Sequence, residues 1–218
     1  MAAGGAYAVD DAAVDGAGAC KVESWLSFAS NSDFIAAVTP ACAVEILRPI
    51  EIGVQLARSR ADREWGASLA PKAKINLLPV ETGKLGLAAS ASPSFDLVTG
   101  ETTGIAVNVP VTFALTEDFR INLNGGWFHD RIARLDHATY GAGVEWSPAK
   151  PLTLIAEVFG LAGERVDPRS VTDPRLQAGL RVTPAESFDI DVIWGRNITG
   201  ENAHWVTLGL NVRFSVAK

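Results

Sequence analysis

Residues that could support catalysis or metal binding are few in this chain. The pairs His129-Asp130 and Asp136-His137 could mark a metal or pH-sensing site in a loop, although solvated loop residues are the simpler interpretation. No G-x-S-x-G motif presents a serine nucleophile. Two cysteines and three histidines nearly exclude a metal cluster with diagnostic ligand spacing. We therefore expect no enzymatic activity, no cofactor and no metal site.

A larger set of candidate functional residues is charged and alternates with apolar residues along the chain. These residues are Glu45, Glu51, Lys72, Lys74, Arg120, Glu145, Glu157, Arg181, Asp189, Asp191 and Arg213. Both signs are interspersed. If these side chains point into a common interior, they form either a salt-bridged, water-containing plug or the lining of a conduction path. A narrow polar lumen could do both.

The elements that would position these charges are β-strands, because the hydrophobic period is two from Cys20 onward. In segment 64–77, for example, Trp65, Leu69 and Ile75 share one face, and Lys72 and Lys74 share the other. The predicted strands are 20–29, 34–47, 50–58, 64–77, 83–93, 103–115, 119–128, 138–147, 151–160, 175–183, 187–196 and 204–215. Most have the length that a tilted strand needs to cross a bilayer. No helical period competes, so the fold class is all-β.

The connections between these strands alternate in length. The short ones are 48–49, 78–82, 116–118, 147–150 and 183–186, and the longer ones are 59–63, 94–102, 129–137, 161–174 and 197–203, with 30–33 as a short exception. Short periplasmic turns and longer external loops are typical of outer-membrane barrels. We therefore expect a single antiparallel transmembrane β-barrel of about twelve strands in a Gram-negative outer membrane. The even strand number places both termini on the periplasmic side.

Aromatic residues form two predicted girdles. Trp65, Trp127 and Trp194 lie at the long-loop ends of their apolar faces, and Phe119, Trp146, Phe188 and Phe214 lie at the short-turn ends. Such rows are expected at the two membrane–water interfaces. A soluble two-sheet binding protein remains the alternative, because alternation alone cannot distinguish a protein core from lipid.

The composition and the N-terminal region add further limits. The 218 residues carry a net charge of −6, which argues against nucleic-acid binding. Ala6-Tyr7-Ala8 has the small-x-small pattern of a signal-peptidase site, and residues 9–19 combine Asp10, Asp11 and Asp15 with Ala and Gly. We expect residues 1–19 to be a signal-peptide remnant and disordered tail, and residues 20–218 to be the barrel.

The two cysteines are predicted to form a disulfide. Cys20 and Cys42 flank the first predicted hairpin and are equidistant from Asn31 at its turn, so the two strands place them opposite one another. An exported protein folds in an oxidising compartment, where such a bond persists. Two buried, unpaired cysteines are the alternative.

The end of the chain resembles the C-terminal β-signal of bacterial outer-membrane proteins. In Thr207-Leu208-Gly209-Leu210-Asn211-Val212-Arg213-Phe214, the matching positions are the polar Thr207, then Gly209, the apolar Val212 and the aromatic Phe214. The resemblance implies recognition by the barrel-assembly machinery. Four residues follow Phe214, whereas family members usually end on the aromatic residue.

Residues 138–214 are similar to a group of proteobacterial barrels labelled as transporters or as outer-membrane proteins of phenol meta-cleavage pathways. The similarity is carried by segments 140–148, 154–160 and 173–181, which read YGAGVEWSP, LIAEVFG and DPRLQAGLR. It implies a barrel and passage of small solutes, aromatic ones included.

These observations predict a narrow channel or passive transporter for small solutes. A non-conducting structural or adhesive barrel that binds a protein partner through its loops is the main alternative. Besides outer-membrane lipid, lipopolysaccharide is an expected contact, because Arg131, Arg134, Arg165, Arg169 and Arg175 make the long loops basic.

Overall fold

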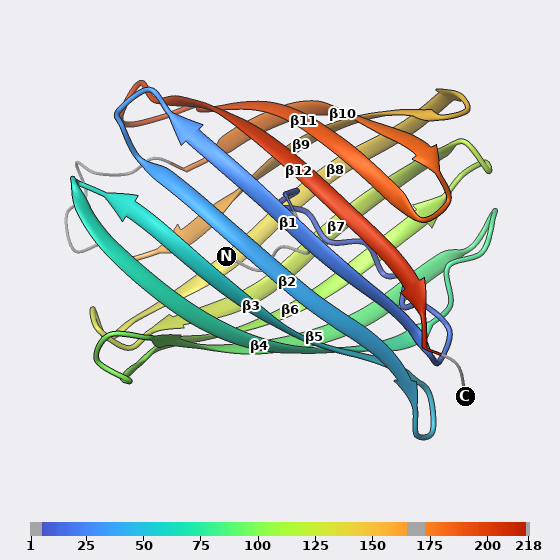
Figure 1. Cartoon of the computed structure of the whole chain (residues 1–218), viewed down its shortest axis with the longest axis horizontal. Coiled ribbons are helices and arrows are strands. Elements are labelled where there is room, and N and C mark those ends of the chain that lie inside the picture. The colour runs from blue at the N-terminus through green and yellow to red at the C-terminus, as the bar shows by residue number, and fades with distance from the viewer. Residues whose placement is uncertain (1–5, 165–172, 217–218) are drawn as a thin grey trace.

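The computed structural model describes residues 6–164 and 173–216 of the chain. Twelve antiparallel strands form one closed barrel, in which each strand pairs with its neighbours in sequence and β12 pairs with β1 (Figure 1). The strands are β1 (Ala19–Ala29), β2 (Phe34–Glu45), β3 (Pro49–Ala61), β4 (Glu64–Leu78), β5 (Leu85–Asp96), β6 (Thr102–Ala114), β7 (Phe119–Asp130), β8 (Leu135–Ala149), β9 (Leu152–Gly163), β10 (Arg175–Ala185), β11 (Phe188–Asn197) and β12 (His204–Ser215). The all-β class and the strand number are confirmed, and closure rules out the two-sheet alternative.

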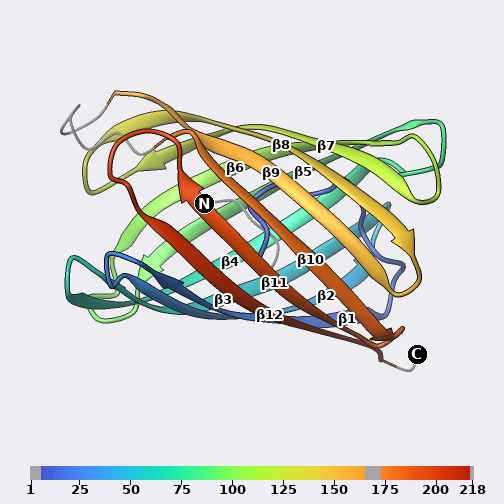
Figure 2. The ribbon, with the colours of Figure 1, turned by 90° about the horizontal axis from the view of Figure 1, so that it is seen from above.

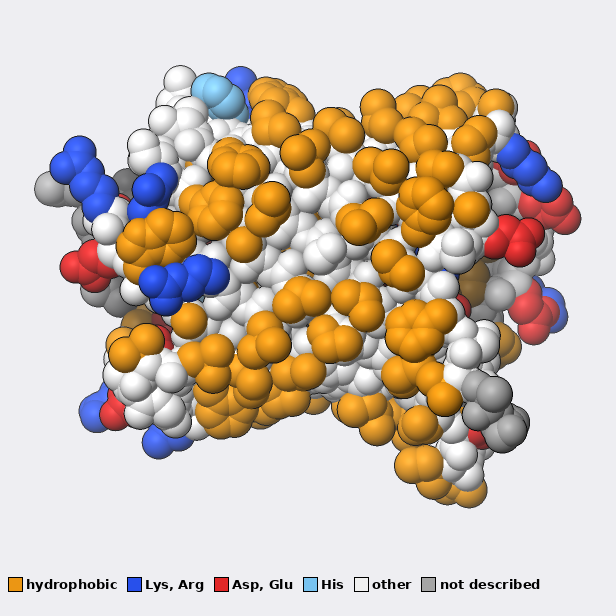
Figure 3. Space-filling model, in the orientation of Figure 1, with side chains coloured by type: hydrophobic (Ala, Val, Ile, Leu, Met, Phe, Trp, Pro, Cys, Tyr) orange, Lys and Arg blue, Asp and Glu red, His pale blue; other side chains and the backbone are white. Residues whose placement is uncertain are grey.

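The alternation of side chains determines which face of each strand points outward. In β12, Val206, Leu208 and Leu210 are exposed, whereas Thr207 and Asn211 are buried inside the barrel. Apolar side chains cover the middle of the visible outer surface and charged side chains gather at its two ends (Figure 3). This arrangement suits a barrel in lipid, since closure pairs the strand backbones and no sheet edge remains. The part of the chain that the structure describes has no helix of the length and apolarity needed to span a membrane.

The seven predicted girdle aromatics lie near the ends of their strands on the outer side. Trp65, Trp127, Trp146, Trp194 and Phe214 are exposed, and Phe119 and Phe188 are partly exposed. Phe119 lies directly opposite Trp146 in the β7–β8 pair. Two further contacts extend the aromatic row at the long-loop end. Phe34 packs edge-on against Trp65. The guanidinium of Arg58 lies 5.1 Å from the centre of the Trp65 ring.

Several strands extend further than the apolar pattern predicts. β7 and β8 pair as far as Asp130 and Leu135, so His129 and His137 lie on strands instead of in a long loop. His129 contacts Asp136 at 3.0 Å across this pair. These strands are longer than predicted because their backbone hydrogen bonds continue past the apolar outer band, where the side chains no longer need to be apolar. The length contrast between the two sets of connections is therefore smaller than predicted.

Residues 6–18 do not form the disordered tail that their composition suggests. Residues 6–14 lie inside the barrel (Figure 2), where Tyr7, Val9 and Ala12 are buried, and the exposed Asp15 and Gly16 lead into the turn before β1. At the short-turn end, the amide of Gly18 donates to the carbonyl of Ala43, and the segment then continues into β1. Ala- and Gly-rich sequence has little tendency to fold alone, but the barrel interior supplies partners for its backbone. Residues 1–5 of the predicted signal-peptide remnant lie outside the described residues.

Cys20 and Cys42 form the predicted disulfide between β1 and β2. They are directly opposed in the register of the two strands, which confirms the argument from their equal distance to the turn. Cys20 also lies opposite Phe214 of β12, so the bond fixes the first hairpin beside the strand pair that closes the barrel.

Replacing both cysteines by alanine should lower the free energy of unfolding by about 3 kcal/mol, because the bond restricts a loop of this size in the unfolded chain. Urea unfolding of the detergent-solubilised protein, followed by tryptophan fluorescence, measures this change. Thiol labelling of the unreduced, denatured wild type serves as the control and should detect no free thiol. Two labelled thiols would contradict the disulfide.

Candidate functional site

The candidate site is the barrel lumen, and the structure places the predicted charged residues at its inward-facing strand positions. Glu45 is at the end of β2 and is exposed. The other ten take part in polar contacts: Glu51, Lys72, Lys74, Arg120, Glu145, Glu157, Arg181, Asp189, Asp191 and Arg213. Their positions follow from the two-residue period, because each lies on the face opposite to the exposed apolar residues of its strand.

One side of the lumen carries a network of arginines and acids. Arg181 donates to both carboxylate oxygens of Asp191, at 2.8 and 3.1 Å, and Arg213 donates to Asp189 at 2.9 Å. Asp191 is fully buried and also accepts from the amide of Asn211 at 2.9 Å. Because each buried acid has a cationic partner, this wall is close to neutral without help from the rest of the chain.

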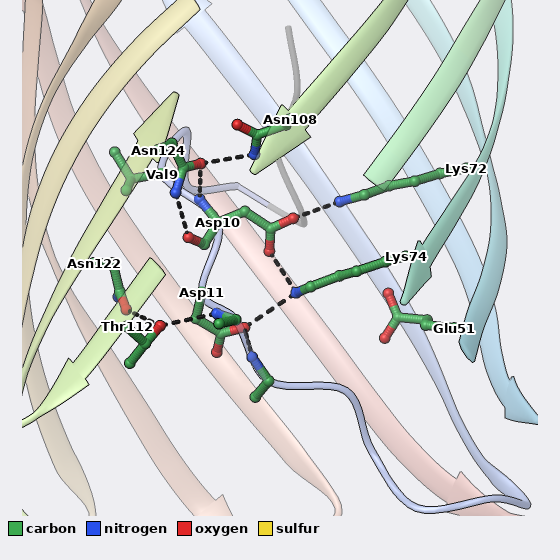
Figure 4. Close-up of polar contacts among 12 residues, drawn as sticks. Val9, Asp10, Asp11, Glu51, Lys72, Lys74, Asn108, Thr112, Asn122 and Asn124 are labelled. Carbon is green, nitrogen blue, oxygen red and sulfur yellow. Dashed lines mark hydrogen bonds and ion pairs between the residues drawn. The ribbon is translucent and has the colours of Figure 1, made fainter. Parts of the chain in front are cut away.

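The opposite side has an excess of positive charge, which the N-terminal segment neutralises. Lys72 and Lys74 of β4 bind different oxygens of the Asp10 carboxylate, at 2.7 and 3.0 Å (Figure 4). Lys74 also contacts Asp11 at 3.2 Å. Burial would raise the pKa of Asp10, but the two ammonium groups outweigh it and hold that pKa well below its usual range. Asp10 is therefore ionised at neutral pH.

The backbone of the same segment is bound by side chains of the wall. The carboxylate of Glu157 accepts hydrogen bonds from the amides of Ala8 and Val9, at 2.9 and 3.2 Å. Asn124 accepts from the amide of Asp10 at 2.8 Å and donates to its carbonyl at 2.6 Å (Figure 4). Ala12 donates to the Thr112 hydroxyl at 2.8 Å. The wall thus replaces the hydrogen bonds that water would otherwise make with this segment.

Side-chain packing completes the fit. The guanidinium of Arg181 lies 5.2 Å from the centre of the Tyr7 ring, a cation–π distance. Gly141 and Gly143 of β8 face Val9, and a Cβ at Gly141 would lie 2.9 Å from a Val9 methyl. Any larger residue at Gly141 would therefore collide with Val9. The wall is shaped to accept the segment.

Cavities lie beside the segment. One, of about 260 Å³, lies among Asp11, Arg120, Glu145, Asp189 and Arg213. Another, of about 90 Å³, borders Tyr7, Asp10, Lys21, Glu23 and Glu157. Both are lined mainly by charged and polar groups, so the space around the segment is suited to water and polar solutes.

Sequence reasoning missed several lumen residues. Lys21 and Glu23 face inward from β1, and Lys21 binds Glu51 at 2.9 Å. Neutral residues also contribute, namely Asn76, Asn108, Thr112, Asn122, Asn124, Gln177 and Asn211. The signal that could have located the segment is the pair Asp10-Asp11 together with Lys72 and Lys74, which lack enough acidic neighbours on their own face.

The remaining predicted positions belong to the assembly-signal resemblance on β12 and to the basic loops. Four residues of β12, the strand that closes the barrel, match the assembly signal. Thr207 and Gly209 face inward, and Val212 and Phe214 face outward. Arg131 and Arg134 border the β7–β8 turn, whereas Arg165 and Arg169 lie outside the described residues. Within the ranges 6–164 and 173–216, no group of three or more histidine, cysteine or acidic side chains could hold a metal ion.

Comparisons with solved structures show that this architecture is shared with bacterial channels. The NanC porin has a TM-score of 0.67 at 7% identity, covering 88% of this chain and 98% of its own. The COG4313 outer membrane channel from Pseudomonas putida F1 has 0.65 at 13% identity, with 94% and 98% covered. The Acinetobacter baumannii outer membrane protein Omp33 has 0.54 at 10% identity, with 89% and 97% covered. At these identities the likeness establishes a porin-like barrel fold.

The comparison with curated proteins gives no match. A family model described as uncharacterised conserved protein UCP029691 matches residues 1–214, which include the luminal segment, β1 to β11, and β12 as far as Phe214. This chain belongs to that family.

Proposed function

We propose that this protein is an outer-membrane channel for small solutes, and that residues 6–18 act as a removable plug of its lumen. The closed barrel, its apolar outer band and its aromatic rows suit the outer membrane of a Gram-negative bacterium. The solved structures that share its fold, the NanC porin and the COG4313 outer membrane channel, support a channel. In the proposed orientation both termini face the periplasm.

The observation that carries the proposal is that a separate segment, and not the wall itself, fills the middle of the lumen. The contacts between this segment and the wall are non-covalent, and the segment joins the barrel at β1. Apart from Ile155 and Ile193, which pack with Tyr7, much of the wall behind it is polar. Asn124, Thr112 and Glu157 are among the polar residues it covers. Water can solvate these groups once the segment leaves, so departure of the segment would open a polar path.

The proposal includes no catalytic step. Contact with lipopolysaccharide through Arg131 and Arg134, and assembly through the motif ending at Phe214, belong to it as further expectations. The alternative is a non-conducting structural or adhesive barrel, in which the same segment would be a permanent part of the core. Conductance measurements separate the two functions.

Replacing Asp10 and Asp11 by asparagine in the full-length chain should open the channel. The substitutions remove the charges that neutralise Lys72 and Lys74, which costs the plugged state about 3 kcal/mol. That change shifts the balance between plugged and open states roughly a hundredfold. Planar-bilayer recording should therefore show that the double variant is open far more of the time than the wild type.

The matched control replaces Asp62 and Asp96 by asparagine, because these acids lie at the ends of hairpins away from the segment. Its conductance should equal that of the wild type. A heat-dependent gel shift checks that each variant is folded. If the folded Asp10/Asp11 variant and the wild type both fail to conduct, the structural alternative replaces the channel.

Replacing Arg181 by serine should raise conductance and shift selectivity toward cations. The change removes a long side chain from the lumen and leaves Asp191 without its two-point partner. The reversal potential in a salt gradient, measured in the Asp10→Asn, Asp11→Asn background, reports the selectivity. Arg58→Ser is the control, because Arg58 lies on the outer face beside Trp65. Unchanged conductance and ion preference in Arg181→Ser would show that Arg181 does not line the path.

A further inference from the structure

The acidic pair of the plug is bound in the way that a small ligand would be bound. We propose that Lys72, Lys74 and Asn124 form a binding site for acidic amino acids and short acidic peptides, and that Asp10-Asp11 occupies this site as an internal mimic. The inference deepens the proposed function, on which it rests, by assigning the class of solute that the open lumen recognises.

The two lysines together bind one carboxylate at two points. They are two residues apart on β4 and therefore point to the same side of the sheet. Each ammonium binds a separate oxygen of Asp10, and the Lys74 side chain is only 3% exposed. A planar carboxylate matches both donors at once, and two such charge-assisted bonds are stronger than contacts between neutral groups.

The charge balance of the wall requires an anion at this position. Glu51 is opposite Lys74 in the β3–β4 register, but Lys21 binds Glu51 at 2.9 Å. Glu23 also interacts electrostatically with Lys72, but Lys21 lies 3.8 Å from Glu23. When Asp10 and Asp11 leave, Lys21, Lys72 and Lys74 share two glutamates, so this side of the lumen keeps a net positive charge. Confined cations without enough counter-ions are unfavourable. The vacated site should therefore attract an acidic solute.

The groups around the lysines select for peptide-like chemistry beside the carboxylate. Asn124 both donates to and accepts from the backbone of Asp10, and Asn76 donates to the carbonyl of Ala12 at 2.9 Å. Glu157 accepts two N–H groups from the residues just before Asp10. A ligand with a carboxylate at one end, and with N–H donors and carbonyl or further carboxylate oxygens near it, satisfies all of these groups. Acidic amino acids and short acidic peptides have this combination.

Isothermal titration calorimetry of the full-length protein in detergent tests the site. The probe is the capped dipeptide acetyl-Asp-Asp-amide, and the matched neutral probe is acetyl-Asn-Asn-amide. The acidic probe should bind the Asp10→Asn, Asp11→Asn variant at least tenfold more tightly than the wild type, because the internal competitor is weakened. The neutral probe should bind at least tenfold more weakly than the acidic one. Adding Lys72→Gln and Lys74→Gln should reduce binding of the acidic probe at least tenfold.

A second variant is included because the neutral segment of the Asp10→Asn, Asp11→Asn variant can still occupy the lumen. Asp10→Lys with Asp11→Lys makes the segment repel Lys72 and Lys74, so it vacates the site. Lys84→Gln is the surface control and should leave binding unchanged, since Lys84 pairs with Glu81 in an exposed turn. Binding of the acidic probe that persists after Lys72 and Lys74 are replaced would overturn the assignment.

The outcome is separable from that of the proposed function, because the binding measurement does not depend on conduction. If the charge-reversal variant is folded and conducts but does not bind acetyl-Asp-Asp-amide, the site is refuted and the channel stands. If it binds the probe through Lys72 and Lys74 but does not conduct, the site is supported and the channel is refuted.

Discussion

Closure of the sheet through the pairing of β1 with β12 is the constraint on which the rest of the structure depends. A barrel whose outer face is apolar has no water there to satisfy a free sheet edge, so each strand must pair on both sides. Closure then directs every second side chain into one confined interior. Since apolar residues occupy the outer positions, the polar and charged residues gather inside and must find partners within the barrel.

The two sides of the lumen meet this requirement in different ways. On β10, β11 and β12, arginines and aspartates from the wall pair directly with one another, as in Arg181 with Asp191. On β4, the wall provides Lys72 and Lys74 but not enough acidic groups. The luminal segment supplies Asp10 and Asp11 to complete the balance. The position of the segment is thus explained by an unequal distribution of charge in the wall.

In the proposed channel, the contacts that hold the segment would also allow its replacement. Apolar filling of the lumen would be difficult to remove, because the wall would then expose a dry surface to water. Here Ile155 and Ile193 pack with Tyr7, but many of the groups behind the segment are amides, hydroxyls and charged side chains, which water or a polar solute can satisfy. Gly141 and Gly143 leave space where Val9 packs, and this space would persist after the segment leaves. A polar wall with a polar filling is compatible with exchange between the two.

The barrel could be predicted from the amino-acid sequence, because a two-residue hydrophobic period is a local property that each strand shows in its own residues. The sequence also located the inward charges and the disulfide, since Cys20 and Cys42 are related by simple counting along one hairpin. Its errors were at strand ends near His129 and His137, where hydrogen bonding continues without an apolar pattern, and in β1. There Lys21 and Glu23 were missed, because the inward Trp25 and the outward Ser24 weaken the alternation.

The position of the N-terminal residues depends on contacts that form only after the barrel has closed. The composition around Asp10 and Asp11, which is rich in alanine, is typical of a disordered tail, because such a segment buries too little apolar surface to fold alone. Its partners are distant in the chain: Asp10 and Lys74 are 64 residues apart, and Ala8 and Glu157 are 149 apart. No local pattern encodes these pairings. They arise because the closed barrel encloses a charged interior of the right size, and this interior supplies the hydrogen bonds and counter-ions that the segment lacks on its own.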